Sequence, residues 1–307
     1  MNTRDGVALF VLAFNHAKYL PQLFESIERN RADLSELVLI DNGSSDTSLQ
    51  DLAAFIEQAR QWGLQVTLQS NPPKTTVARA LNQALVASRA ELVAVIAADD
   101  FLLQDRFAAQ VAALADPAVS FVYSNGYVCD EAGILSSIPV HDAHAVRTLS
   151  SSGTATRPSL FYPVPTLFTH CALFRRSALV EIGAWDERLA IEDWPLNIRL
   201  FQRFPDGCRF VEGHVSAYRR HASNVSKRRF RQYIGQKRII ECLARGADLR
   251  RGLFALYAAQ ALASVKRRQW WRFGAFSRAA LRARPGTRTV FQWLSNEVHR
   301  RIANKIR

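Results

Sequence analysis

The hydrophobic and polar positions of the first 125 residues follow two alternating patterns. Short, mostly apolar runs are typical of strands, and they cover 7–13, 37–40, 64–68, 92–98 and 119–123. Between these runs apolar residues recur at helical spacing, which predicts helices over 19–29, 48–62, 77–88 and 104–114. The alternation of strands and helices predicts an α/β fold with a mostly parallel, doubly wound sheet.

The chain after about residue 125 is less regular. Four prolines and the run Ser150–Gly153 predict a long loop over 139–165, and loops of this length are commonly functional. Further predicted elements are a strand near 166–174, helices near 177–182 and 192–204, and strands near 210–211 and 215–218. From about residue 228 onward the pattern is helical.

The charge is divided unevenly along the chain. The whole sequence has 40 Lys and Arg against 27 Asp and Glu, a net charge of +13. Residues 226–307 hold 21 of those basic residues and 3 of the acidic ones, which leaves 19 basic and 24 acidic residues in 1–225. A body of net charge −5 therefore carries a helical extension of net charge +18. Such asymmetry predicts a polyanionic partner for the extension.

Aromatic and basic residues alternate in this extension. Lys266–Phe273 interleaves cations with two tryptophans. A second stripe places Phe291, Trp293, Leu294 and Val298 beside Arg300, Arg301 and Lys305. Helices of this kind suit an anionic membrane surface, which is the favoured partner of residues 226–307. A packed helical subdomain or dimer interface is the alternative, and nucleic acid is the least favoured partner.

Several classes of protein are disfavoured by what the sequence lacks. No window reaches about 18 consecutive apolar residues, so we expect no transmembrane helix, and 7–14 fits a strand better than a signal peptide. The four cysteines lack CxxC spacing, which argues against a zinc or disulfide framework and fits a reducing compartment. The first β–α turn lacks a GxGxxG motif, which argues against a dinucleotide-dependent dehydrogenase. No GxSxG nucleophile elbow is present either. We expect a cytoplasmic location, peripheral on the inner face of the plasma membrane.

Two adjacent carboxylates follow the fourth apolar run. Residues 92–98 have the composition of a strand buried on both faces, so Asp99 and Asp100 are expected just past its C-terminal end. Ligands of open α/β sheets bind at that edge. Two like charges repel there unless a cation or a polyhydroxyl ligand joins them, and a helix N-cap is the alternative role. Asp41 follows the second run in the same way, and there the alternative is an Asx turn.

Four separated segments share the order and spacing of a known family. They are Phe14–Leu20, Asp41–Asp46, Ala97–Asp100, and Gly183–Glu187 with Ile191–Trp194. Together they resemble the inverting family 2 glycosyltransferases, which have the GT-A fold, over roughly residues 5–225. The resemblance implies a Rossmann-like sheet that binds a nucleoside diphosphate sugar, followed by the basic helical extension.

The resemblance assigns donor binding to residues near the strand ends. Asp41 would hold the nucleotide base and Asp99 the ribose. Asp100 and His221 would hold a divalent metal, Mn²⁺ or Mg²⁺, on the diphosphate, although a histidine near a strand end can also be incidental. Further donor-binding positions are Phe14, Asn15, Asn82 and Arg219. The sequence has Ala97 where many relatives carry an aspartate, so one oxygen ligand is missing.

A second acidic pair precedes the helix predicted over 192–204. In the family, the residue that matches Asp193 is the general base, which takes the proton of the acceptor hydroxyl. Glu192 and Trp194 would contact the acceptor. The alternatives are stabilisation of the helix N-terminus by the two carboxylates and a core position for Trp194.

These residues predict an enzyme that moves a sugar from a nucleoside diphosphate donor, UDP by preference, to a hydroxyl of a glycan or lipid-linked glycan. Residues 1–115 would form the nucleotide-sugar half, 116–225 the acceptor and catalytic half, and 226–307 the basic helical region. The alternative from another class is a non-catalytic nucleotide-sugar-binding or scaffold protein. It would dock on membrane or RNA through the basic extension and would not need Asp193.

Overall fold

The computed structural model of the chain contains two compact units. One comprises Met1–Pro158 with Thr166–Lys227, and the other comprises Ser159–Pro165 with Arg228–Arg307. The described residues are 6–73, 75–153, 157–162, 164–222, 224, 229–287, 289–291 and 293–295. The three-part division predicted from the sequence stays a prediction.

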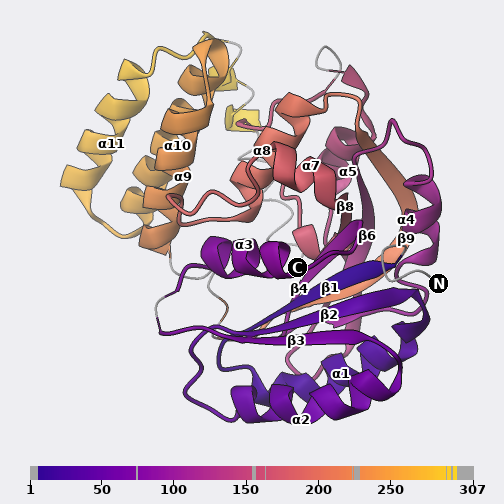
Figure 1. The fold of residues 1–307 in the computed structure, drawn as a ribbon. Coiled ribbons are helices and arrows are strands. Elements are labelled where there is room, and N and C mark those ends of the chain that lie inside the picture. Colours follow the sequence, from indigo (N-terminus) through magenta and orange to yellow (C-terminus); the bar gives the residue numbers. More distant parts are fainter. Residues whose placement is uncertain are drawn as a thin grey trace. The chain divides into compact units, whose positions relative to one another are not determined.

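The first unit begins with a parallel sheet that follows the predicted alternation. Four strands lie in the order β3–β2–β1–β4, and the ladders between them are parallel. They are β1 Val7–Ala13, β2 Leu34–Asp41, β3 Gln65–Ser70 and β4 Leu92–Ala97. The helices between them are α1 Leu20–Arg29, α2 Ser48–Gln61 and α3 Val77–Ala87, with short 3₁₀ turns at Ala17–Tyr19 and Arg31–Asp33. Figure 1 shows α1 and α2 on one face of this sheet and α3 on the other.

The apolar runs explain why this sheet is covered on both faces. Strand β1 is buried along almost its whole length, as the absence of alternation in its sequence predicts. Every second residue of its run faces a core shared with α1 and α2, which includes Leu9, Val11, Leu23, Leu39, Phe55 and Ile96. Because β1 is central, with β2 on one side and β4 on the other, the strand order changes direction here. The ends of β1, β2 and β4 therefore meet at the position where ligands of such sheets bind.

The second half of the sheet is mixed. Strands β8, β6, β9 and β5 continue the order beyond β4, and β7 pairs with β6. They are β5 Phe101–Leu102, β6 Phe121–Cys129, β7 Leu135–Pro139, β8 Ala172–Arg175 and β9 Cys208–Arg219. Strand β8 is antiparallel to both β4 and β6, whereas β9 is parallel to β6. The helices are α4 Ala108–Ala113, α5 Ala143–Ser150, α7 Arg176–Glu181 and α8 Asp193–Arg203, with a 3₁₀ turn at Thr169–Cys171.

Several sequence predictions in this half are wrong. The expected loop over 139–165 contains α5, which begins where the side chain of Asp142 accepts a hydrogen bond from the Ala145 N–H. The two short strands expected near 210 and 216 are one strand, β9, which continues through the polar stretch between them, where His214 pairs with Asn125 of β6. The predictions missed β5 and β7, and the helix expected from 104 begins at Ala108.

The second unit is helical, as predicted. Its helices α9 Arg229–Leu243, α10 Gly246–Lys266 and α11 Trp270–Arg282 pack side by side (Figure 1). Gly252 of α10 allows a close approach to α9, because a Cβ atom there would lie 3.1 Å from the side chain of Ile240. Within the part of the chain that the structure describes, no helix is long and apolar enough to cross a membrane. Val298, Arg300, Arg301 and Lys305 lie outside the described residues.

Candidate active site

Asp41 is the last residue of β2 and is 2% exposed. One carboxylate oxygen, Oδ2, accepts hydrogen bonds from the Gly43 and Ser44 N–H groups, both at 3.2 Å. The other, Oδ1, is buried without a hydrogen-bond partner among the residues described. The Asx turn considered from the sequence does form, but it uses only one oxygen. A buried acceptor without a donor is costly, so Oδ1 is suited to accept from a ligand N–H or hydroxyl.

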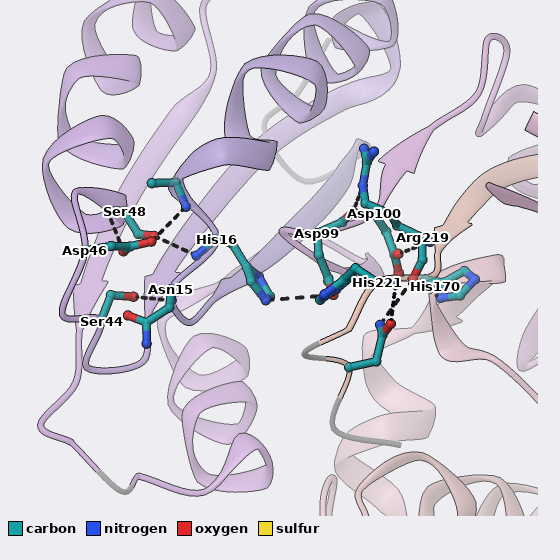
Figure 2. A network of polar contacts seen from close by, with 12 residues as sticks. Asn15, His16, Ser44, Asp46, Ser48, Asp99, Asp100, His170, Arg219 and His221 are labelled. Atoms are coloured by element: carbon teal, nitrogen blue, oxygen red, sulfur yellow. Dashed lines mark hydrogen bonds and ion pairs between the residues drawn. The ribbon is translucent and has the colours of Figure 1, made fainter. Parts of the chain in front are cut away.

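The loop after β1 is fastened to the start of α2. The N–H groups of Asn15 and His16 donate to the hydroxyls of Ser44 and Ser48, both at 2.9 Å (Figure 2). The Asn15 side-chain oxygen accepts from the Ser45 N–H at 2.7 Å, and Asn15 has a left-handed φ of 57°. The first two sequence motifs thus form one polar loop cluster. Its donor-binding role, and that of the exposed Phe14 beside it, stays a prediction.

Asp99 and Asp100 lie just past β4, as predicted, but their carboxylates have different partners (Figure 2). Asp99 Oδ2 lies 2.8 Å from His221 Nε2 and 3.8 Å from His16 Nε2. Asp100 Oδ1 accepts the Arg219 N–H at 2.8 Å, and its Oδ2 lies 3.4 Å from His170 Nδ1. Burial, and then the charge of Asp99, raise the pKa of Asp100 well above its usual value.

Arg219 connects distant segments beneath these carboxylates. Its Nε donates to the Asp99 carbonyl at 2.6 Å and its Nη1 to the Glu131 carbonyl at 2.9 Å. Its Nη2 donates to Gln22 Oε1 at 2.6 Å, and the guanidinium lies 4.8 Å from the centre of the Tyr19 ring. Arg219 is 1% exposed. The structure therefore gives Arg219 a positioning role, and its predicted contact with a donor stays a prediction.

Two histidines of this site were not singled out from the sequence. His16 lies in the first motif, and burial lowers its pKa. His170 lies in the 3₁₀ turn before β8, where burial lowers its pKa to about 3, so the ring is neutral. His16 Nδ1 and His170 Nε2 are buried and lack partners among the described residues. The position of His16 beside Asn15 was the only signal for it, and the pairing of His170 with Asp100 required the antiparallel strand β8.

Asp193 begins α8, as its place before the apolar stripe predicts. Its Oδ1 accepts the Trp194 N–H at 2.7 Å. Its carbonyl accepts from Asn197 Nδ2 at 3.0 Å, and Asn197 Oδ1 accepts the buried Tyr123 hydroxyl at 2.6 Å. Burial raises the pKa of Asp193, which makes the carboxylate a stronger base than in water. Glu192 and Trp194 are half-buried on either side of it.

Asn82 connects the fourth motif to helix α3. Its Oδ1 accepts the Trp185 N–H at 3.0 Å, and its Nδ2 donates to the Trp185 carbonyl and to Glu187 Oε1, both at 2.9 Å. Trp185 is 2% exposed and belongs to the core. Since the amide of Asn82 is occupied by these partners, the structure gives it a positioning role. Its predicted contact with a donor stays a prediction.

The chemistry of the carboxylate pair fits a divalent cation. Asp99, Asp100 and His221 supply oxygen and imidazole ligands, and a cation would favour ionisation of the buried Asp100. Over the described ranges, no three His, Cys, Asp or Glu side chains are already arranged to hold a metal. His221 contacts Asp99 and not Asp100, the residue with which it was predicted to share a metal.

Comparison with known proteins identifies the family. The model of glycosyl transferase family 2 matches residues 8–183, so the chain belongs to this family. The poly-beta-1,6-N-acetyl-D-glucosamine synthase of Staphylococcus aureus (strain COL) is 25% identical over 201 residues. That match covers 64% of this chain and 46% of the synthase, so the chain spans just under half the length of this relative.

Solved structures agree on the fold. S. aureus TarS (residues 1–349) in complex with UDP-GlcNAc has a TM-score of 0.61 and 16% identity, and the match covers 90% of this chain and 81% of that one. The mannosyltransferase PcManGT from Pyrobaculum calidifontis, in complex with GDP-Man and Mn²⁺, has a TM-score of 0.59 and 18% identity. That match covers 95% of this chain and 79% of the other. The predicted α/β GT-A fold with a mostly parallel sheet is confirmed.

Proposed function

We propose that this chain transfers a sugar from a nucleoside diphosphate sugar to a hydroxyl of a glycan or lipid-linked glycan, with inversion at the anomeric carbon. One observation carries the proposal: in a family 2 chain, the unpartnered buried Oδ1 of Asp41 lies at the same sheet edge as Asp99. A base or ribose of the donor would satisfy Asp41, and the ribose hydroxyls would approach Asp99. A UDP donor is preferred because TarS was solved with UDP-GlcNAc.

Asp193 would act as the general base. Its carboxylate is fixed by the Trp194 N–H, and its backbone is fixed through Asn197 to Tyr123. It would take the proton of the acceptor hydroxyl while that oxygen attacks the anomeric carbon from the face opposite the diphosphate. One base is enough for this direct displacement. Glu192 and Trp194 would border the acceptor.

Asp100, with His221, would hold a divalent cation at the diphosphate, and PcManGT was solved with Mn²⁺. When bound, the cation would supply positive charge that stabilises the departing diphosphate. Arg219 would keep Asp99 and Asp100 in place through the Asp99 carbonyl and the Asp100 carboxylate.

The experiment is a comparison of donor binding and turnover in Asp193→Asn. We expect UDP to bind the variant as tightly as the wild type in calorimetry with Mn²⁺. Release of UDP from UDP-GlcNAc, UDP-glucose or UDP-galactose in the presence of acceptor should fall by about 10²–10⁴-fold, which is the usual contribution of a general base.

Asp206→Asn is the matched control, because Asp206 is exposed beyond the other end of α8 and should leave turnover unchanged. Full turnover by Asp193→Asn would exclude Asp193 as the base. Failure of the wild type to bind any of the three donors or GDP-mannose would overturn the proposed function as a whole.

A further inference from the structure

Helix α11 presents large apolar side chains to solvent. Trp270, Trp271 and Leu281 are 64%, 72% and 73% exposed. Side chains three, four, seven or eleven positions apart share a helix face, so Trp270 and Leu281 lie on one side, with Trp271 at its border. Another side of α11, which holds Phe276 and Ala280, packs inward: Ala280 is 5% exposed, and the ring of Phe276 lies 5.6 Å from that of Tyr233 in α9.

Cations occupy the same exposed side. Arg278 and Arg282 are exposed: at about 100° per residue, Arg278 falls between Leu281 and Trp271 around the helix, and Arg282 lies just beyond Trp271. The turn before the helix adds the exposed Arg267 and Arg268, and the guanidinium of Arg272 lies 5.0 Å from the Trp271 ring. The arrangement resembles an interfacial helix, in which aromatic rings enter the headgroup region and long cationic side chains reach the phosphates.

A second exposed apolar group follows in the same unit. Phe291 and Leu294, three positions apart, are 72% and 48% exposed, whereas the Trp293 ring lies 6.1 Å from that of Phe254 in α10. We define the docking face as Trp270, Trp271 and Leu281 of α11 together with Arg267, Arg268, Arg278 and Arg282.

We propose that the docking face binds the surface of an anionic lipid bilayer. Charge complementarity selects this partner, because residues 249–296 contain ten Lys and Arg and no Asp or Glu. A second copy of the chain would bring two such basic faces together and would be repelled. RNA bases could stack on the two tryptophans, but the aliphatic side chain of Leu281 has no stacking surface or hydrogen-bonding group for a base. Burial of Leu281 among acyl chains is favourable, so a bilayer fits the whole face better.

The test uses the full chain and sedimentation with lipid vesicles. One set of vesicles is phosphatidylcholine alone, and the other is equal parts phosphatidylcholine and phosphatidylglycerol. We expect the wild type to partition at least about tenfold more strongly into the anionic vesicles, because several cations act together. The triple variant Trp270→Ser, Trp271→Ser, Leu281→Ser should lose at least about tenfold of that partitioning.

A matched control replaces three exposed apolar residues of the first unit: Val86→Ser, Ile134→Ser and Val180→Ser. It should bind as the wild type does. The pair Arg278→Gln, Arg282→Gln should lose about 25-fold in partitioning, since each surface cation contributes about fivefold. The control pair Arg79→Gln, Arg89→Gln, which is exposed on the first unit, should lose none. Circular dichroism of each variant verifies that α9–α11 remain folded.

Three results would overturn the proposal. The first is equal binding of the wild type and the apolar triple variant to anionic vesicles. The second is a concentration-dependent dimer that the triple variant abolishes, which would assign the face to a second copy. The third is tighter binding to single-stranded RNA than to anionic vesicles at the same salt concentration. The donor-binding measurements above are independent of all three, so failure here would leave the proposed function intact.

Discussion

At the scale of single residues, the two adjacent aspartates illustrate how far neighbouring carboxylates can differ. Asp99 faces the imidazoles of His221 and His16, whereas Asp100 is 2% exposed and held by the Arg219 N–H. The raised pKa of Asp100 means that its charged form is destabilised by the fold. A carboxylate whose charged form is destabilised by burial is typical of a functional site. A bound cation would offset this desolvation cost.

Asp100→Asn should therefore stabilise the metal-free protein and lower its Mn²⁺-dependent affinity for UDP. Removing the buried negative charge should raise the free energy of unfolding at pH 7 by about 1–2 kcal/mol, because the desolvation cost and the repulsion from Asp99 both disappear. The measurement is urea unfolding in the presence of EDTA. The same variant should lose the Mn²⁺-dependent part of UDP binding in calorimetry.

The exposed Asp116→Asn provides the control and should change neither quantity. A loss of stability in Asp100→Asn together with unchanged Mn²⁺-dependent binding would show that Asp100 is a structural carboxylate only.

We expect the buried His141 to make the stability of the fold sensitive to acid. Its Nδ1–H donates to the Ser124 carbonyl and its Nε2 accepts the Phe168 N–H, both at 3.0 Å, so the ring must be neutral. Burial lowers its pKa to about 4 from 6.5. Between those values the unfolded chain binds a proton that the folded protein does not, so stability falls as the pH falls below 6.5. By pH 5 the loss from this residue should be about 2 kcal/mol.

The measurement is the free energy of unfolding against pH, compared between the wild type and His141→Asn. The variant should be less stable at pH 7, since two hydrogen bonds change, but its stability should decline less steeply between pH 6.5 and 5. Parallel curves for the two proteins would rule out this role of His141.

At the scale of helices and strands, the sequence predicted those elements whose apolar pattern lies within their own segment. β1 to β4 and α1 to α3 were predicted because each buried run and each amphipathic stripe is visible within its own segment. The same reasoning predicted that Asp41, Asp99 and Asp100 would lie at strand ends. It missed the two-residue β5, and it divided β9, because these strands are defined by pairing with partners 87 to 116 residues away.

The site contacts that were not predicted from the sequence also depend on long-range pairing. His170 meets Asp100, and Asn82 meets Trp185, only because antiparallel β8 and the turn after α7 return to the sheet edge. Neither contact leaves a periodic signal in the sequence. The capping interaction of Asp142 was visible locally, but the surrounding prolines and serines outweighed it in the prediction of a loop.

Gly126 tests the pairing of β6 with β9. A Cβ atom at this position would lie 2.6 Å from the Ser216 carbonyl and 3.0 Å from Cys171 Sγ. Gly126→Ala should therefore push the two strands apart and lower the free energy of unfolding by about 1–3 kcal/mol, which is typical of overpacking. Gly274→Ala is the contrasting variant, because its new methyl group would meet only the flexible side chain of Arg278, at 3.6 Å.

Gly274 lies inside α11, where alanine is the better helix former by about 1 kcal/mol, so that variant should be neutral or stabilised. Urea unfolding monitored by circular dichroism gives both values. If Gly126→Ala were as stable as the wild type, the close approach of β6 and β9 at Ser216 would be refuted.

At the scale of the whole molecule, chemistry and charge are assigned to different units. The residues of the candidate active site belong to the unit of residues 1–158 and 166–227, whereas the exposed tryptophans and their arginines belong to the helical unit. The net charge of +13 is therefore not a property of the donor site, since residues 1–225 carry −5. Under the two proposals above, the basic helical unit would hold the chain at an anionic surface, which is where the proposed lipid-linked acceptor would be anchored.

This division makes a prediction that hydrogen exchange can test in the intact chain. UDP with Mn²⁺ should slow exchange in peptides that cover β1, β2 and the segment 92–102, because a ligand at about 100 times its Kd stabilises the state it binds by roughly 2.7 kcal/mol. Peptides from α10 and α11 should change little. Anionic vesicles without nucleotide should give the reverse pattern, with protection confined to 266–282. If vesicles protected the strands and UDP protected α11, the assignment of donor binding and lipid binding to separate units would be wrong.

The variant Asp41→Ala tests the base-binding role of β2 separately. If UDP still protected this variant from exchange, Asp41 would not bind the base, and the proposed lipid binding by α11 would be unaffected.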